Sequence, residues 1–192
     1  MKTFAEQKAF LSQTGQIYYI ESVNFPRIMV RMDGESSPHQ QGPGFGTVNC
    51  QAPASNADGN PWEQFKIHYI NTPNVHTVAF ESVAYPGNYL RMAGVNSPSQ
   101  SGPGFGTVNC QASIGPWEQF VIEFLPPDPG VNPPPGDHAA IMSAAFASNY
   151  LRLDSGGNTS FSGPGFGTVN CQASIGPYEK FYITTRWPGS TS

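Results

Sequence analysis

Charged residues are scarce in this chain. Asp, Glu, Lys and Arg make up 11% of its 192 residues, and only nine residues are Lys or Arg, so the formal net charge is −4. A protein that binds nucleic acid needs a concentrated positive surface to neutralise phosphates. The composition therefore argues against nucleic acid as a partner.

Cysteine and long apolar runs are also scarce. The three cysteines, an odd number, leave a full disulfide framework incomplete, so we expect reduced thiols. No stretch approaches the roughly 20 apolar residues that span a bilayer. The first residues, MKTFAEQKAFLSQTG, lack the apolar region of a signal peptide. We expect a cytoplasmic protein that does not insert into membranes, and leave release by a non-classical route open.

Glycine and proline, by contrast, are abundant, with 21 and 19 residues. Such a balance is typical of many short strands joined by tight turns. Aromatic residues, at 12%, supply core volume. A chain of this length can bury a core without metals or disulfides, as one domain or two small ones.

A threefold internal repeat organises the chain. The decapeptide GPGFGTVNCQ occurs verbatim at Gly42–Gln51, Gly102–Gln111 and Gly163–Gln172. Each copy then ends on a related segment, which reads PWEQF at 61–65 and 116–120 and PYEKF at 177–181. A repeat of this period has to be recognised before any local motif is interpreted.

The repeats predict an all-β fold. Within the second copy, turn residues separate four strand-like runs, at His76–Ala84, Asn88–Met92, Gly106–Gln111 and Glu118–Phe124. Twelve strands in three pseudo-equivalent four-stranded repeats indicate a β-trefoil, in which three hairpins cap a six-stranded barrel. A three-bladed propeller falls below the usual blade number, and a solenoid would have distinct capping repeats.

The repeats also set the expected domain boundaries. We predict an N-terminal extension at 1–14 and a single β-trefoil domain at 15–187. Its repeats span about 15–70, 76–125 and 138–187, with a Pro-rich linker at 125–137. In the extension, Phe4, Lys8 and Leu11 can share one face of a short helix, or the segment is a frayed tail.

Most of the repeated residues have a structural explanation. Glycines serve turns, and the repeated Phe, Val and Cys suit an interior. One Arg and one Glu are the only charges present in every copy, and we expect them to pair: Arg31, Arg91 and Arg152 with Glu63, Glu118 and Glu179. The cysteines have no recurring His beside them, and no catalytic motif is present. We expect no metal, no cofactor and no enzymatic activity.

The candidate ligand-binding residues are aromatic, amide and acidic side chains beside the turns. Aromatic faces stack on sugar rings while amides and carboxylates bind hydroxyl groups; the alternative is that the rings only seal the ends of the barrel. The predicted set is Trp62, Trp117 and Tyr178, each after a Pro; Tyr89 and Tyr150, each after an Asn; Asn88 and Asn149; and Asp33 and Asp154.

Several segments resemble known families. NYLRM at 88–92, NYLRL at 149–153 and IGPWEQF at 114–120 resemble strands of fascin-like β-trefoils, which share their fold with ricin-like domains. SVNFP at 22–26 and SVAYPGNYLR at 82–91 resemble the arabinose-binding trefoil module of arabinofuranosidases. That module implies His and Asp near the sugar; Asp33 and Asp154 fit, but Ala93 stands in the second copy and no His recurs. Fascin-type actin binding implies basic patches, which few Lys and Arg can build.

These observations predict a non-catalytic, lectin-like protein. We expect up to three weak, related sites that bind glycans or glycoconjugates and gain from multivalency. Ile28 and Met29 replace the Asn–Tyr pair in the first copy, so its site is expected to differ. The alternative is a protein-interaction module, either fascin-like and actin-binding or an enzyme inhibitor. It would use the loop Pro53–Asn60 or the linker Leu125–Asp137 as its contact element.

Overall fold

The computed structural model describes residues 4–13, 15–35, 43–53, 60–71, 76–96, 102–126 and 138–185. It contains one α-helix, twelve strands and three 3-10 turns over these residues. The elements are α1 Phe4–Leu11, β1 Tyr19–Ser22, β2 Met29–Asp33, β3 Thr47–Gln51, η1 Pro61–Glu63, β4 Phe65–Asn71, β5 His76–Ser82, β6 Tyr89–Ala93, β7 Thr107–Gln111, η2 Pro116–Glu118, β8 Phe120–Leu125, β9 His138–Ser143, β10 Tyr150–Asp154, β11 Thr168–Gln172, η3 Pro177–Glu179 and β12 Phe181–Thr184.

The strands form where the sequence predicts them, with ends displaced by about two residues. The run predicted from Glu118 starts at Phe120 instead, because Pro116–Glu118 forms a 3-10 turn. Proline fixes φ near −65° and has no N–H, which suits the first position of such a turn. Leu90 and Met92, which are predicted to share one face, both lie in the hydrophobic core, and Arg91 between them is buried as well.

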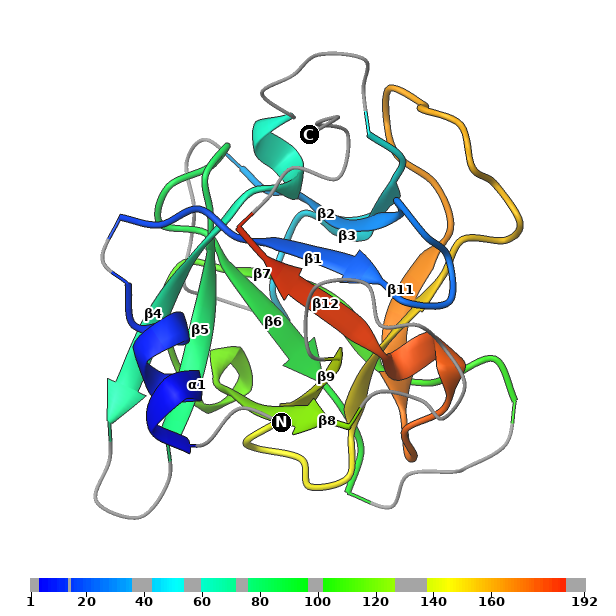
Figure 1. Cartoon of the computed structure of the whole chain (residues 1–192). Helices are drawn as coiled ribbons and strands as arrows, with labels where there is room; N and C mark the ends of the chain where they lie inside the picture. The colour runs from blue at the N-terminus through cyan, green and yellow to red at the C-terminus, as the bar shows by residue number, and fades with distance from the viewer. Residues whose placement is uncertain are drawn as a thin grey trace.

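Six strands form a closed barrel. Antiparallel pairs join β1 to β12, β12 to β9, β9 to β8, β8 to β5 and β5 to β4 (Figure 1). The ring closes where Tyr18 and Phe65 exchange two backbone hydrogen bonds of 2.8 and 2.9 Å. The hairpins β2–β3, β6–β7 and β10–β11 complete the three repeats. This is a β-trefoil, and closure leaves the barrel without a free edge.

The segment that ends each repeat fills the barrel. Phe65, Phe120 and Phe181, which end the PWEQF and PYEKF segments, are all completely buried. Truncation of such a Phe costs about 3–5 kcal/mol. The recurrence of this Phe in every copy therefore follows from the core.

The decapeptides join the three repeats in a cycle. The Phe of one decapeptide and the Cys of the next repeat exchange a pair of backbone hydrogen bonds, each 2.8–2.9 Å long. The pairs are Phe45 with Cys110, Phe105 with Cys171, and Phe166 with Cys50. Because the third pair returns to the first repeat, the cycle is closed.

A side-chain contact reinforces each of these junctions. The Nδ2 group of the decapeptide Asn donates to the Pro carbonyl of the preceding copy, at 2.9–3.1 Å: Asn109 to Pro43, Asn170 to Pro103, and Asn49 to Pro164. Each decapeptide thus supplies both surfaces of the contact, one to each neighbour. A substitution in one copy would have to suit both neighbours, which explains why the ten residues recur verbatim.

The three cysteines are buried and unpaired. Burial raises the pKa of each thiol to about 12. Since the thiolate is the reactive form, they are small interior side chains rather than nucleophiles.

Helix α1 lies beside β4, and its last residue, Leu11, belongs to the core (Figure 1). The Tyr18 hydroxyl donates to the Phe10 carbonyl. Among the described residues, no helix has the length and hydropathy of a membrane span. Most of the loop Pro53–Asn60 and of the linker Leu125–Asp137, the proposed protein-contact elements, lies outside the described residues.

Two glycines of the second decapeptide give a direct test of the cyclic junction. Gly102 and Gly104 both have positive φ, at 93° and 90°. A Cβ at Gly104 would lie 2.4 Å from Asn170 Oδ1, whereas a Cβ at Gly102 meets nothing within 4 Å. We expect Gly102→Ala to cost about 1–2 kcal/mol from backbone strain alone. Gly104→Ala should cost about 1–3 kcal/mol more, because the Asn170 contact is also displaced.

The measurement is the free energy of unfolding of both variants by urea denaturation. Equal destabilisation by the two substitutions would contradict the role given to the junction contact.

Candidate functional site

A buried Arg–Glu pair holds the 3-10 turn of each repeat against the hairpin. The Arg Nε and Glu Oε1 atoms are separated by 3.9 Å for Arg31–Glu63, 3.6 Å for Arg91–Glu118 and 3.8 Å for Arg152–Glu179. This confirms the predicted pairing. A buried Arg that lost its partner would be left uncompensated, so the pairs are structurally costly to change.

Each of these arginines also lies over the aromatic ring of its 3-10 turn. The distances from Arg Cζ to the ring centroid are 5.6 Å for Trp62, 4.4 Å for Trp117 and 4.8 Å for Tyr178. Such cation–π contacts fix the orientation of the rings. The predicted aromatic residues therefore occupy equivalent places in the three repeats.

The ring of each 3-10 turn meets an aromatic residue from the following repeat. Trp117 and Phe146 have centroids 5.7 Å apart, and Tyr178 and Phe25 have centroids 5.4 Å apart. In the first repeat, the corresponding contact is a hydrogen bond of 3.4 Å from Trp62 Nε1 to the Tyr85 hydroxyl. The three sites therefore lie at junctions between repeats.

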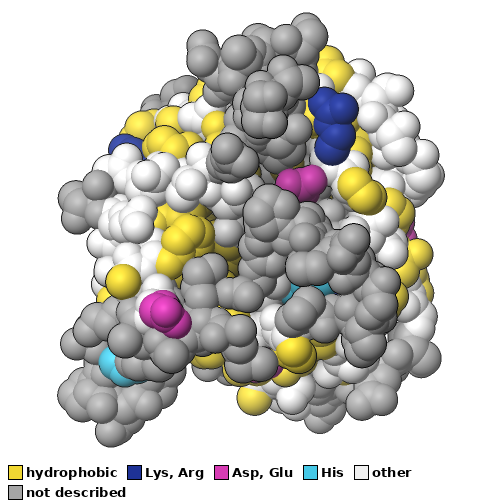
Figure 2. Space-filling model, viewed as in Figure 1, with side chains coloured by type: hydrophobic (Ala, Val, Ile, Leu, Met, Phe, Trp, Pro, Cys, Tyr) yellow, Lys and Arg dark blue, Asp and Glu magenta, His cyan; other side chains and the backbone are white. Residues whose placement is uncertain are grey.

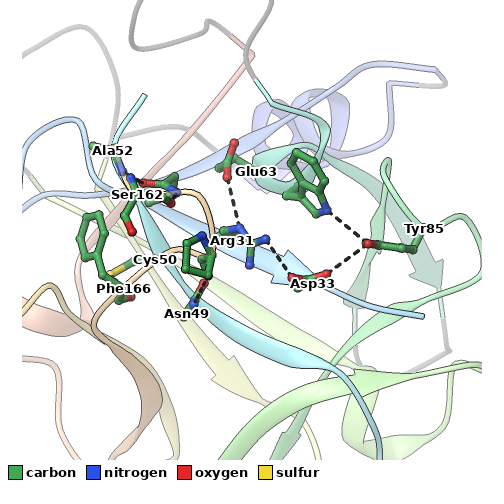
Figure 3. A network of polar contacts seen from close by, with 12 residues as sticks. Arg31, Asp33, Asn49, Cys50, Ala52, Glu63, Tyr85, Ser162 and Phe166 are labelled. Atoms are coloured by element: carbon green, nitrogen blue, oxygen red, sulfur yellow. Dashed lines mark hydrogen bonds and ion pairs between the residues drawn. The ribbon is translucent and has the colours of Figure 1, made fainter. Parts of the chain in front are cut away.

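The junction of the first repeat is closed by its own polar contacts. The Tyr85 hydroxyl donates to Asp33 Oδ1 at 3.1 Å, and Arg31 Nη2 donates to Asp33 Oδ2 at 2.9 Å. Figure 3 shows Arg31 between Glu63 and Asp33, with Tyr85 beyond the aspartate. The structure thus brings Trp62 and Asp33 together, but their polar groups already have partners.

The junction of the second repeat contains a depression. It has a volume of about 250 Å³ and is lined by Arg91, Gln111, Ser113, Pro116, Trp117 and Glu118. Trp117 is 41% exposed, one of the three large exposed hydrophobic residues in the described part of the chain. An exposed indole beside amide, hydroxyl and charged groups is typical of a site for a ligand with one apolar face and several polar groups.

Two of the predicted contacts are corrected by the structure. Asn88 and Asn149 are completely buried. Asn88 exchanges hydrogen bonds of 3.0 Å with the backbone of Glu35, and Asn149 bonds to the backbone of Val95 in the same way. Their amides tie one repeat to the loop of the preceding one, so they offer no surface to a ligand.

The two predicted tyrosines do not line the depression, although Tyr89 pairs across the hairpin with Gln111, which does. Both Tyr89 and Tyr150 are half-buried, and the Tyr89 ring contacts His68 at 5.6 Å between centroids. Burial is the main cause of a raised pKa at both, with Glu81 adding to it at Tyr89 and Glu123 at Tyr150. They remain candidates for ligand contacts, but outside the depression.

In the third repeat, Asp154 and Tyr178 flank Arg152. Arg152 Nη2 donates to Asp154 Oδ2 at 2.9 Å, and Tyr178 is half-buried. Hydrogen bonds from the Gly156 N–H and from Arg152 lower the pKa of Asp154. This junction has the predicted residues but presents less ring surface than Trp117.

Several residues of the depression were absent from the predicted set. Gln111 and Ser113 line it, as do Arg91 and Glu118, which sequence reasoning treated as structural only. Gln111 ends the decapeptide and is present in all three copies. Because the whole decapeptide was interpreted as scaffold, its place at the edge of the depression was not predicted. The signal that could have found it is its adjacency to the turn that leads to Trp117.

The glutamates of the Arg–Glu pairs differ in the hydrogen bonds that their carboxylates accept. Gly115 N donates to Glu118 Oε2 at 2.8 Å, and Gly176 N does the same for Glu179. In the first repeat Asn60 stands in place of glycine, and neither oxygen of Glu63 has a hydrogen-bond partner among the residues that the structure describes. Burial, opposed in part by Arg31, raises the pKa of Glu63 to about 7.

On the described part of the face in Figure 2, basic side chains are isolated and form no patch. Steering of polyanions or of an acidic protein surface needs such a patch.

Solved structures match most of the chain at low identity. A mosquitocidal holotoxin superposes on 90% of the chain with a TM-score of 0.60 and 17% identity, and the chain spans 17% of that protein. The cytolethal distending toxin of Actinobacillus actinomycetemcomitans superposes on 94% of the chain, with 98% of its own chain covered, a TM-score of 0.54 and 13% identity. SeviL bound to asialo-GM1 saccharide superposes on 88%, with 96% of its own chain covered, a TM-score of 0.52 and 11% identity.

At these identities the likeness shows the fold alone. No protein-family model matches the sequence, and no curated protein is significantly similar to it.

The unsolvated carboxyl of Glu63 gives a pH-dependent prediction. Because its pKa is raised from 4.5 to about 7, the folded state holds the proton more tightly than the unfolded state. This group's contribution to stability is therefore greatest below about pH 4.5 and is lost as the pH rises to about 7. Glu63→Gln stays neutral and does not share this loss. We therefore expect the difference in free energy of unfolding between Glu63→Gln and the parent to shift by on the order of 3 kcal/mol in favour of the variant between pH 4.5 and pH 8.

The measurement is urea denaturation of both proteins across this range. Glu179→Gln is the matched control and should gain less, because the Gly176 N–H already solvates that carboxylate. Parallel pH profiles for the parent and Glu63→Gln would refute the assignment.

Proposed function

We propose that this protein is a non-catalytic, lectin-like carbohydrate-binding protein whose principal site is the depression of the second repeat. The observation that carries the proposal is the exposed indole of Trp117, held by Arg91 beneath it and bordered by Gln111, Ser113 and Glu118. Sugars present C–H groups on one face and hydroxyl groups at the edge, which this combination of groups suits.

The orientation of the indole is fixed before any ligand arrives. Arg91 contacts Trp117 at 4.4 Å, and Phe146 abuts it from the next repeat. A ring that is already held loses little conformational freedom on binding. The depression is small, about 250 Å³, so it suits one sugar residue rather than a long chain.

The other two junctions are related but less open. Trp62 and Tyr178 are half-buried, and the Trp62 Nε1–H donates a hydrogen bond to the Tyr85 hydroxyl. They are secondary sites at most, so binding would be weak at each site and would gain from clustered glycans. SeviL, whose structure matches most of this chain, is seen bound to asialo-GM1 saccharide, which shows that a chain of similar fold can present a glycan site.

Substitution of the exposed indole tests the proposal. We expect binding to a glycan array by the parent, and a loss of affinity of roughly 5- to 150-fold in Trp117→Ala, because stacking and C–H contacts contribute about 1–3 kcal/mol. Trp117→Tyr, the residue found at the equivalent position 178, should retain part of the affinity.

A second exposed aromatic residue provides the control. Phe161 is 49% exposed and does not line the depression, so Phe161→Ala should bind as the parent does. Equal loss in both alanine variants, with unchanged thermal stability, would count against a specific site at Trp117. No binding by the parent to any glycan would reject the function.

A further inference from the structure

The three arginines of the junctions do not have the same partners. Arg31 contacts two carboxylates, Asp33 at 2.9 Å and Glu63 at 3.9 Å. Arg152 likewise contacts Asp154 at 2.9 Å and Glu179 at 3.8 Å. The polar partners of Arg91 in the described part of the chain are one carboxylate, Glu118, and the neutral amide of Asn109.

The difference comes from one residue at the end of a strand. Ala93 stands where the other repeats have Asp, and the backbone position is the same in all three. In each hairpin this residue pairs with the first Thr of the decapeptide strand: Asp33 with Thr47, Ala93 with Thr107, and Asp154 with Thr168. The second repeat therefore lacks a carboxylate beside an otherwise unchanged guanidinium.

The guanidinium of the second repeat has taken a substitute acceptor. Arg91 Nη1 donates to Asn109 Oδ1 at 3.1 Å. In the other repeats the equivalent oxygens, Asn49 Oδ1 and Asn170 Oδ1, are buried without a partner, because the Arg there faces its aspartate. The scaffold thus accommodates both arrangements, and a carboxylate is a stronger acceptor for Arg than an amide oxygen.

A carboxylate at the surface can reach these buried arginines. The side chains of Asp33 and Asp154 are 40% and 35% exposed, yet both bond to arginines whose side chains are only 5% and 8% exposed. Arg91 has a side-chain exposure of 3% and lines the depression. Its low exposure is therefore compatible with contact from a carboxylate that lies beside Ala93.

We infer that the second repeat selects an acidic sugar, a pyranose that carries a carboxylate. The ligand carboxylate takes the place that Asp33 and Asp154 fill in the other repeats, and the sugar ring lies against Trp117. The inference rests on the proposed function, since it names the ligand class of the same site. Uronic acids and sialic acids share this chemistry.

The test compares acidic oligosaccharides with their neutral counterparts. The probes end in glucuronic acid or in N-acetylneuraminic acid, each measured beside its carboxyl-reduced form by isothermal titration calorimetry. We expect the parent to bind at least one acidic form about tenfold more tightly than its reduced form, with a preference that falls as salt is added. Comparison of the two acids shows whether the site prefers a uronic acid or a sialic acid.

Substitution of Ala93 isolates the carboxylate contact. Ala93→Asp restores the arrangement of the other two repeats, so it should fold normally and abolish the acidic preference while neutral affinity remains. Ala93→Asn has the same size without the charge, and it should retain a larger part of the preference than Ala93→Asp. Loss of all binding in Ala93→Asp and Ala93→Asn alike would indicate a steric block and contradict the inference.

The two levels of the proposal fail differently. Equal affinity of the parent for acidic and reduced probes would overturn the acidic preference and leave the lectin function standing. If neither form binds while the glycan array is also negative, the proposed function itself is rejected.

Discussion

The structure depends on one repeated contact, the pair of backbone hydrogen bonds between the Phe of each GPGFG segment and the Cys of the next repeat. Three such contacts close into a cycle, as head-to-tail interfaces do in a ring of identical subunits. In a ring, one surface has to fit two neighbours. Here the same decapeptide supplies the Phe and Pro carbonyl to one neighbour and the Asn and Cys to the other, so drift in a single copy would damage two junctions.

The decapeptide contacts are the same in all three repeats, so the repeats differ instead around the Arg–Glu pairs. The Arg–Glu pair is present in every repeat, but its surroundings differ by one or two residues. Among the described residues, the Glu63 oxygens of the first repeat accept no hydrogen bond, and in the second repeat Arg91 has the Asn109 amide in place of a second carboxylate. The three junctions are thus natural variants of one another, compared within the same scaffold. These differences are the basis on which we propose a ligand site in the second repeat.

In the site that we propose, stability and recognition depend on the same side chains. Arg91 holds Glu118 within the fold and also supports the indole of Trp117. A binding group supported by a buried ion pair is rigid, which favours recognition by a shallow surface. The arrangement also explains why the site contains charges that look purely structural in the sequence. In the proposed site, the Arg91 guanidinium has both roles.

The sequence by itself determined the number of repeats, the strands and their inward faces, and the Arg–Glu pairs. These properties follow from periodicity and from residues that recur in each copy, which a single chain displays. Tertiary structure decided which groups meet between repeats. Asn88 bonds to Glu35 of the preceding repeat, 53 residues away, so no local pattern could show that it is buried and not at a binding surface. In the same way Ala93 became informative only when the Arg31–Asp33 and Arg152–Asp154 contacts revealed which acceptor it lacks. Contacts between distant segments depend on how the barrel closes, and that closure is a property of the whole fold.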